Sequence, residues 1–239
     1  ALKEEDLLSG YIEETSEAYA IAKISGILAC RAYNRQYKTK RFIAMISNSM
    51  YGPNDNFDLE NSHVLSALIR KFHEAKESGS KKIVLWGTGR PRREFIFCDD
   101  VAEASIFAMK NAEKLENHHY NIGNGVDFSI EELAQMIAEI VGYKGEIEWD
   151  SSKPDGTMKK LLDSSKFLKL GWKHSTNIGD GLKKTYSWYL ENLSQYYKHD
   201  ESDISIGYLK EKAAWVRQET LKIHKIAQET RIADRKSVV

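Results

Sequence analysis

Helix-like and strand-like segments alternate along most of this 239-residue chain, and this alternation limits the fold class more than any other feature. Short apolar runs that read as strands are separated by longer segments whose apolar residues recur at helical spacing. Such alternation is typical of α/β folds. The expected strands are 42–46, 82–86, 94–97, 119–122 and 147–149, and the expected helices begin at 17, 64, 101, 129, 160 and 177.

Several segment ends carry their own signals. The first helix is expected to end near Tyr37, and Ser129 with Glu132 fits a capping box for a helix that ends near Gly142. Asp99 or Asp100 is expected to cap the helix 101–110. The helix from residue 160 is expected to reach Leu170, the last one to reach Asn192, and residues 1–16 to be polar and irregular.

Tyr19 and Lys23 lie four residues apart on the first expected helix, which places both side chains on one face. The ordinary pKa of tyrosine is about 10, and a nearby cation lowers it. Such a pair can exchange a proton while a hydride moves at an adjacent carbon. The spacing alone is weak evidence, because Tyr208 and Lys212 repeat it.

Composition excludes several kinds of partner. Lys plus Arg and Asp plus Glu both total 35, so the net charge of zero predicts no binding to nucleic acid or to an anionic membrane. No run of 18 apolar residues is present, so no membrane span is expected. Cys30 and Cys98 lack the spacing of a metal or redox site and are expected to be buried small hydrophobes in a reducing cytoplasm.

The order of Tyr19-x-x-x-Lys23, a strand and then Tyr51-Gly-Pro53 resembles the extended short-chain dehydrogenase/reductases. Within them the chain resembles the GDP-L-fucose synthases over roughly residues 5–195, through the motifs Tyr33–Tyr37, Tyr51–Phe57, Asn61–Val64 and Lys153–Thr157. The resemblance implies part of a Rossmann-type doubly wound sheet in 1–195, with a smaller substrate lobe formed mainly by 52–92 and 123–195.

The resemblance also implies a two-stage reaction on GDP-4-keto-6-deoxy-D-mannose: epimerisation at C3 and C5, then reduction at C4 with NADPH. Tyr19 would donate the proton to the C4 oxygen. Lys23 would adjust the pKa of Tyr19 and bind the nicotinamide ribose. His63 would be the epimerisation acid, because imidazole titrates near neutral pH. The other reading of His63 is a histidine that caps a helix.

Further site residues follow from the same resemblance. Lys23, His63 and the four residues Ser47, Asn48, Ser49 and Met50 are expected at the cofactor, although Ser47–Met50 departs from the family's Pro-Thr-Asn-Leu. The GDP-sugar is expected at Lys71, where the family has arginine, and at Trp86, Arg93 and Asp155. Two plainer readings stay open: Trp86 as core, and Arg90, Arg92 and Arg93 as a solvated turn.

No Gly-rich dinucleotide turn follows a strand in this sequence, so we expect an N-terminally truncated chain that is inactive alone. A homodimer in the cytoplasm is the family expectation. Residues 196–202 read as a linker, and 203–239 as a helical tail that resembles the start of transketolase-like proteins. The alternatives are another NAD(P)-dependent nucleotide-sugar epimerase or dehydratase, and a non-catalytic interaction subunit.

Overall fold

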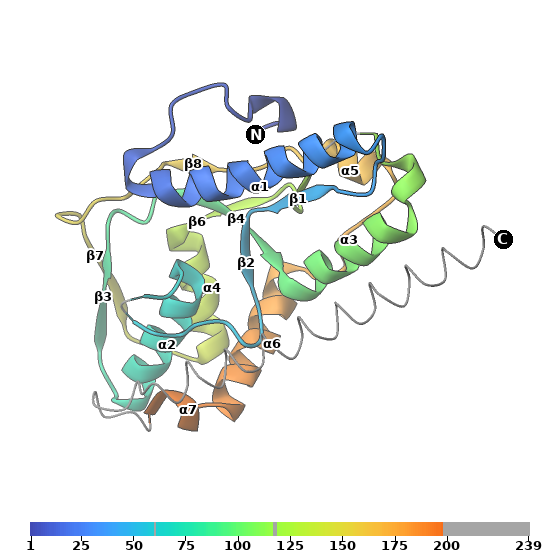
Figure 1. The fold of residues 1–239 in the computed structure, drawn as a ribbon. Helices are drawn as coiled ribbons and strands as arrows, with labels where there is room; N and C mark the ends of the chain where they lie inside the picture. The colour runs from blue at the N-terminus through green and yellow to red at the C-terminus, as the bar shows by residue number, and fades with distance from the viewer. Residues whose placement is uncertain (60, 117–118, 198–239) are drawn as a thin grey trace. The chain divides into compact units, whose positions relative to one another are not determined.

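A computed structural model of the chain describes residues 1–59, 61–116 and 119–197 (Figure 1). It divides the chain into two compact units, Ala1–Glu191 and Asn192–Val239. The described part of the second unit contains the short helix α7, Ser194–Tyr197. The predicted tail, 203–239, lies outside the described residues.

Helices and strands alternate through the first unit, which confirms the α/β fold class. No helix in the described ranges combines the length and apolar character needed to cross a membrane. The α-helices of this unit are α1 (Glu17–Gln36), α2 (Val64–Glu77), α3 (Cys98–Lys110), α4 (Ile130–Val141), α5 (Ser165–Lys169) and α6 (Ile178–Glu191). Three 3-10 turns are η1 (Glu4–Asp6), η2 (Glu14–Ser16) and η3 (Ala112–Lys114).

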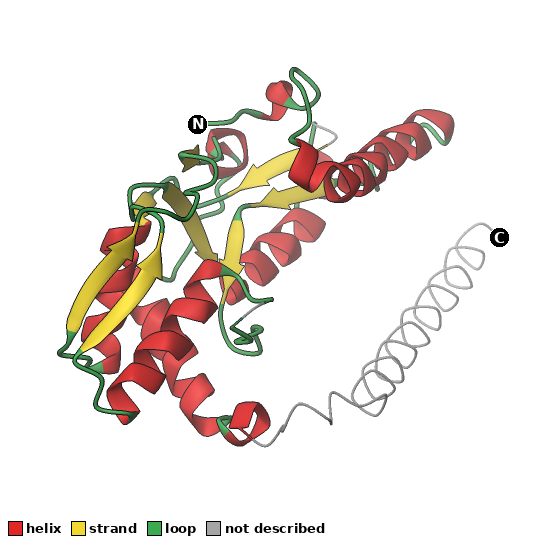
Figure 2. Cartoon of the chain, turned by 90° about the vertical axis from the view of Figure 1, so that its left-hand side faces the viewer, coloured by secondary structure: helices red, strands yellow, loops and turns green. Residues whose placement is uncertain are grey.

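The strands form short groups rather than one broad sheet (Figure 2). β1 pairs in parallel with β5, β2 with β4, and β3 with β7, while β4 also pairs antiparallel with β6 and parallel with β8. The strands are β1 (Ala44–Ser47), β2 (Ser49–Tyr51), β3 (Lys82–Trp86), β4 (Arg92–Phe97), β5 (His119–Ile122), β6 (Asp127–Ser129), β7 (Glu146–Asp150) and β8 (Lys159–Lys160).

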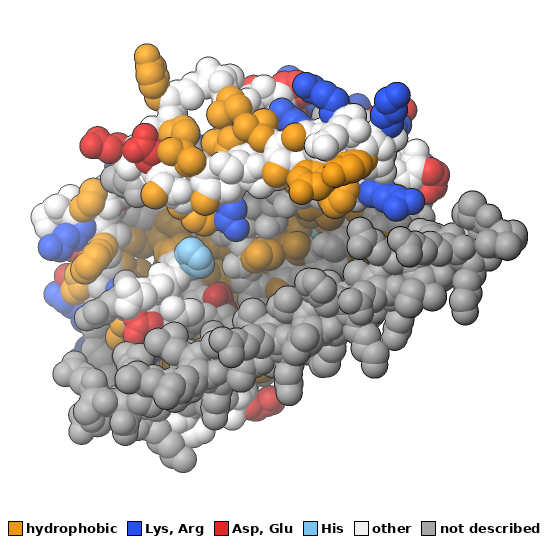
Figure 3. Space-filling view, in the orientation of Figure 1, with side chains coloured by type: hydrophobic (Ala, Val, Ile, Leu, Met, Phe, Trp, Pro, Cys, Tyr) orange, Lys and Arg blue, Asp and Glu red, His pale blue; other side chains and the backbone are white. Residues whose placement is uncertain are grey.

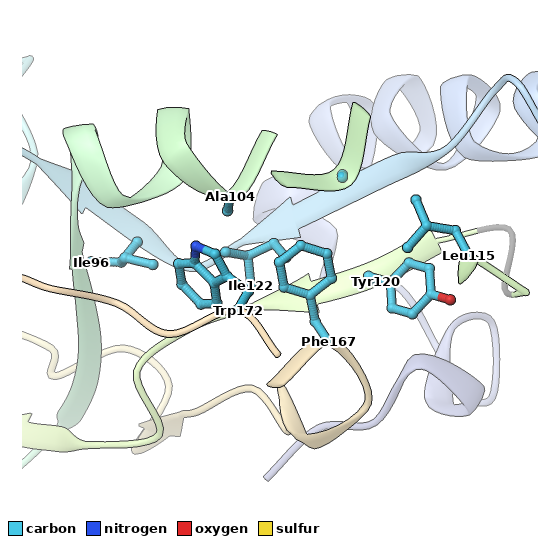
Figure 4. Close-up of a cluster of buried hydrophobic side chains, with 8 residues drawn as sticks. Ile96, Ala104, Leu115, Tyr120, Ile122, Phe167 and Trp172 are labelled. Atoms are coloured by element: carbon cyan, nitrogen blue, oxygen red, sulfur yellow. The ribbon is translucent and has the colours of Figure 1, made fainter. Parts of the chain in front are cut away.

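One hydrophobic core fills the space between α3, β5 and α5 (Figure 4). Phe167 and Ile122 are fully buried there, and Trp172 is almost so. Burying each such side chain stabilises the fold by roughly 1.5–3 kcal/mol. The cluster consists of Ile96, Ala104, Ala108, Leu115, Tyr120, Ile122, Phe167 and Trp172.

A second group of helices packs together, α2 against α4 and α4 against α6, and α2 also contacts β3. α2 buries Leu65, Leu68, Ile69 and Phe72, whose spacing defines one apolar face of a helix. α4 begins with the predicted capping box: the amide of Glu132 donates to Ser129 Oγ at 3.0 Å, and the amide of Ser129 donates to Glu132 Oε2 at 2.7 Å. Both predictions for α4, its start and its end before Gly142, are confirmed.

The N-terminal segment is more ordered than its polar sequence indicates. Leu2 bridges to Leu162, and Glu4 is buried, where its Oε1 accepts the amide of Asn121 at 3.1 Å. Arg31 of α1 lies with Nη2 3.0 Å from His119 Nδ1, and the other ring nitrogen lies 3.0 Å from the carbonyl oxygen of Glu4. Since a guanidinium can only donate, His119 Nδ1 accepts and Nε2 donates to Glu4.

Two expected segments begin later in the structure than in the sequence analysis. The strand expected at 42–46 is β1, Ala44–Ser47, because the backbone of Phe42 is bound to the side chain of Asn34. The helix expected at 160–170 is only α5, because Lys159 and Lys160 pair with β4 as β8.

The expected cap of α3 was wrong. The helix begins at Cys98 after Phe97, and no side chain caps it. Asp100 is instead buried and accepts hydrogen bonds from the amide and hydroxyl of Ser175, at 2.8 and 2.9 Å. Cys30 and Cys98, expected to be buried, are half-buried.

Candidate functional site

Tyr19 and Lys23 lie together on an exposed face of α1, as their spacing predicts. Lys23 Nζ lies 5.5 Å from the centroid of the Tyr19 ring, within the range of a cation–π contact. The Tyr19 side chain is 68% exposed, and Lys23 forms no ion pair with any described residue. Further along α1, Ile27 and Asn34 are buried and hold the helix to the rest of the unit. The pair is therefore free to meet a ligand.

The segment Ser47–Met50 runs from the last residue of β1 into β2, with Asn48 between the strands, and the Asn48 side chain is bound inside the protein. Asn48 Nδ2 donates to Glu94 Oε2 at 3.3 Å and to the carbonyl oxygen of Lys160 at 3.1 Å. Glu94 is fully buried and also accepts the amides of Gly125 and Leu162, at 2.8 and 3.0 Å. Asn48 therefore fixes the segment, while Met50 is 49% exposed.

His63 occupies the residue before α2, as its plainer reading as a capping histidine expects. Its imidazole makes no capping hydrogen bond, however, and the side chain is exposed. The ring is thus available for proton transfer rather than used to cap the helix.

The Tyr51-Gly-Pro turn has a structural role. Tyr51 is buried against Phe95 and Phe97, and burial raises the pKa of its phenol well above the ordinary value, so it is a poor proton donor. Gly52 has φ of +155°, and a β-carbon there would lie 2.3 Å from Cys98 Sγ. The turn accordingly requires glycine.

Trp86, at the end of β3, is exposed over 69% of its surface, so its reading as a core residue was wrong. Two ammonium groups face its ring: the Nζ atoms of Lys71 and Lys153 each lie 5.6 Å from the ring centroid. Lys71 comes from α2, and Lys153 comes from the loop between β7 and β8. Lys153 was not among the predicted site residues.

Asp155, on the same loop, is bound to the turn after β3. Its two carboxylate oxygens accept the amide and the hydroxyl of Thr88, both at 2.6 Å. These hydrogen bonds lower the pKa of Asp155, which keeps it ionised. Gly87 has φ of +83° and no room for a β-carbon, which would lie 2.4 Å from Asp155 Oδ1. Asp155 thus holds the loop beside Trp86.

The three arginines after this turn do not form one solvated cluster. Arg92 binds Asp127 at 2.8 Å and Glu132 at 3.3 Å. Arg93 is half-buried, and burial lowers the pKa of its guanidinium. Its Nη1 donates to the carbonyl oxygen of Arg92 at 2.9 Å, and no carboxylate of the described residues pairs with it. A half-buried guanidinium without a counter-charge suits an anionic ligand.

The loop 150–157 therefore joins the predicted substrate residues: Lys153 meets Trp86, Asp155 meets Thr88, and Gly156 lies beside Arg93. Within the described ranges, no hydrogen bond or ring contact links this group to Tyr19, Lys23 or His63. Lys153 and Thr88 were missed, although Lys153 stands in the Lys153–Thr157 motif of the family resemblance.

Comparison with known proteins places these features in a family context. Residues 1–123 match the NAD dependent epimerase/dehydratase family. The chain is 50% identical over 192 residues to GDP-L-fucose synthase 1 of Arabidopsis thaliana, covering 80% of this chain and 58% of that protein. It is 48% identical over 202 residues to GDP-L-fucose synthase of Escherichia coli K12, covering 82% of this chain and 63% of that protein.

A solved structure with a similar fold is a GDP-D-glycero-L-gluco-heptose synthase from Campylobacter jejuni in the presence of NADPH. The TM-score is 0.70 at 39% identity, over 80% of this chain and 64% of that one. The chain thus spans about three fifths of the length of the curated relatives it matches, 58% and 63% of the two above.

Proposed function

The chain belongs to the NAD dependent epimerase/dehydratase family, and from that membership we propose that the protein makes GDP-L-fucose. The proposed reaction is 3,5-epimerisation of GDP-4-keto-6-deoxy-D-mannose followed by its NADPH-dependent reduction at C4. Relatives named GDP-L-fucose synthase at about half identity support the choice of substrate.

One observation carries the proposal. Four residues expected to bind a GDP-sugar, from four separate segments of sequence, lie around a single loop: Lys71, Trp86, Arg93 and Asp155. Lys71 and Arg93 supply cations for a diphosphate, and the exposed indole of Trp86 supplies a flat apolar surface. A lobe with a purely structural role would not need Lys71 and Arg93, cations that form no ion pair with a described carboxylate.

Tyr19 is proposed as the proton donor to the C4 oxygen. Lys23 Nζ lies 5.5 Å from the centroid of the Tyr19 ring, so its positive charge stands beside the proposed donor. NADPH, when bound, supplies the hydride to C4. The exposed Tyr19–Lys23 pair, with an ammonium that no described carboxylate neutralises, fits the ribose end of such a cofactor. Ser47, Ser49 and Met50 remain proposed cofactor contacts, with Asn48 fixing their backbone.

His63 is proposed as the acid that returns protons to C3 and C5. Protons beside a ketone are acidic enough for a side-chain base to remove, and inversion needs an acid to return them on the other face. An exposed imidazole without a hydrogen bond to α2 suits that task.

We also infer a homodimer in the cytoplasm with no nucleic-acid or membrane partner. The dimer is supported by exposed apolar side chains on α1, and Figure 3 shows apolar surface over that helix. Ile21 (49%), Leu28 (41%) and Tyr33 (51%) are among the exposed apolar residues of α1. Light scattering on the purified protein gives the mass that tests it.

The test of function supplies full-length protein with GDP-4-keto-6-deoxy-D-mannose and NADPH, follows the loss of reduced cofactor and identifies the sugar. We expect GDP-L-fucose from the unchanged protein. Tyr19→Phe should lower the rate of reduction by about 100- to 10,000-fold, the usual contribution of a general acid. His63→Asn should leave reduction and yield a sugar that is not epimerised.

Other outcomes would select a different function. Cofactor consumption without inversion at C3 and C5 would indicate a reductase for another GDP-sugar, as the likeness to the heptose synthase allows. No turnover by a folded, full-length protein would favour the non-catalytic interaction subunit.

A further inference from the structure

Two lysine ammonium groups approach one exposed tryptophan in this protein, and the sequence motifs explain only one of them. Lys71 and Lys153 each place Nζ 5.6 Å from the centroid of the Trp86 ring. Two like charges that face one ring repel each other, and an anion bound by both would remove that repulsion.

No acidic side chain in the described ranges forms an ion pair with either lysine, although the pKa of Asp150 is lowered by hydrogen bonds from Ser152 and, to a smaller extent, by the charge of Lys153. Asp150, the last residue of β7, accepts the amide of Ser152 at 3.1 Å, and Asp155, on the same loop as Lys153, accepts from Thr88. Neither Lys71 nor Lys153 forms an ion pair with a described residue. Both carboxylates thus accept hydrogen bonds from other groups, and neither pairs directly with Lys153.

The loop also holds Lys153 in position. Pro154 restricts the backbone directly after the lysine, and Asp155 is bound through both carboxylate oxygens to Thr88. The lysine thus projects from a segment fixed to the end of β3, the strand that carries Trp86. Prior positioning of this kind reduces the entropy lost on binding a ligand.

We propose that Lys153 is a substrate-binding residue that, together with Lys71, binds the diphosphate of a nucleoside diphosphate sugar beside Trp86. The inference rests on the proposed function and adds a cation to its substrate site. Two ammonium groups match the two phosphates of a diphosphate, and lysine binds phosphate oxygens as a point charge without the planar fork of arginine. Because Lys71 cannot bind two phosphate oxygens with a planar fork, the second cation, Lys153, would supply the additional contact.

The experiment is isothermal titration of the 239-residue chain with GDP, at two concentrations of sodium chloride. Lys153→Met removes the charge and keeps a long side chain over Trp86, and we expect the Kd to rise about tenfold, the contribution of one charge-assisted hydrogen bond. The loss of affinity at high salt should also be smaller in this variant, because one cation fewer meets the ligand. Lys153→Arg should stay within about threefold of the unchanged chain, since it keeps the charge.

The matched control is Lys173→Met, which removes a charge from another exposed lysine and should leave the Kd unchanged. Thermal unfolding of each variant separates a binding effect from a folding effect. If Lys153→Met unfolds early, Lys153→Gln, which also removes the charge, replaces it in the same titrations at the two salt concentrations.

Failure of this inference is distinguishable from failure of the proposed function. A normal Kd and a normal salt dependence in folded Lys153→Met would overturn the role of Lys153 and leave the GDP-sugar site intact. An absence of GDP binding by the unchanged chain would overturn both.

Discussion

At the scale of single residues, the carboxylate of Asp127 links three strands through ion pairs. It lies on β6, accepts Arg92 Nε of β4 at 2.8 Å, and has Lys159 Nζ of β8 at 3.0 Å. The hydrogen bond from Arg92 is the main reason that the pKa of Asp127 is lowered. A carboxyl whose pKa is lower in the folded protein stabilises the fold above its ordinary pKa, about 4, and that contribution is lost as the pH falls through the lowered value.

Asp127→Asn should therefore weaken the fold at neutral pH and make its stability less sensitive to acid. Urea unfolding between about pH 6 and pH 2.5 measures both effects, because the variant has no carboxyl to protonate at this position. Glu103→Gln, at an exposed site on α3, is the control and should follow the unchanged chain. Parallel acid curves for Asp127→Asn and the unchanged chain would contradict this account.

At the scale of elements, Asn34 joins the end of α1 to the start of β1. Its side chain is buried; Nδ2 donates to the carbonyl oxygen of Phe42 at 2.7 Å, and Oδ1 accepts the Phe42 amide at 3.1 Å. Asn34→Ala leaves both backbone groups unpaired, and we expect the free energy of unfolding to fall by about 2–4 kcal/mol. Chemical denaturation measures the change.

The neighbouring Arg35→Ala is the control for Asn34, because its side chain is exposed on the same turn and a change below about 0.5 kcal/mol is expected. Asn34→Asp should fall between the two, since it can still accept the Phe42 amide but cannot donate. Equal stability of the alanine variant and the unchanged chain would show that this link is not needed.

The hydrogen bonds between Asn34 and Phe42 show why some predictions from the sequence succeeded and others failed. Local patterns predicted α2 and α4 well, because their apolar spacing and the Ser129–Glu132 cap act within a few residues. The late start of β1 depends on the bonds of Phe42 to Asn34, eight residues before it. The absence of a cap on α3 depends on Ser175, 75 residues away from Asp100. Local patterns cannot show which distant group will take a side chain away from its local role.

The candidate site divides in the same way. The residues of Tyr19–Lys23 lie on one helix, so their contact follows from helical spacing. The contacts of Lys153 with Trp86 and of Asp155 with Thr88 each cross 67 residues, so only the folded chain brings them together. A family resemblance could name Trp86 and Asp155, but not the second lysine beside them.

At the scale of the whole first unit, the proposed GDP-sugar site spans elements that are otherwise separate. Lys71 belongs to α2, Trp86 to β3, Arg93 to β4, and Lys153 to the loop 150–157. A ligand that contacts all four should stabilise them together, because binding to the folded state lowers the population of every local opening that breaks the site.

Hydrogen exchange with and without saturating GDP measures this coupling. We expect slower exchange in 64–77, 82–93 and 150–157 at once, and little change in 17–36, which carries Tyr19 and Lys23 but no residue assigned to the nucleotide. In Lys153→Met, at a GDP concentration that saturates the unchanged chain but not this variant, the protection should weaken in all three segments, because they share one ligand. Protection limited to a single segment, or equal in 17–36, would show that GDP binds elsewhere or that these elements do not form one site.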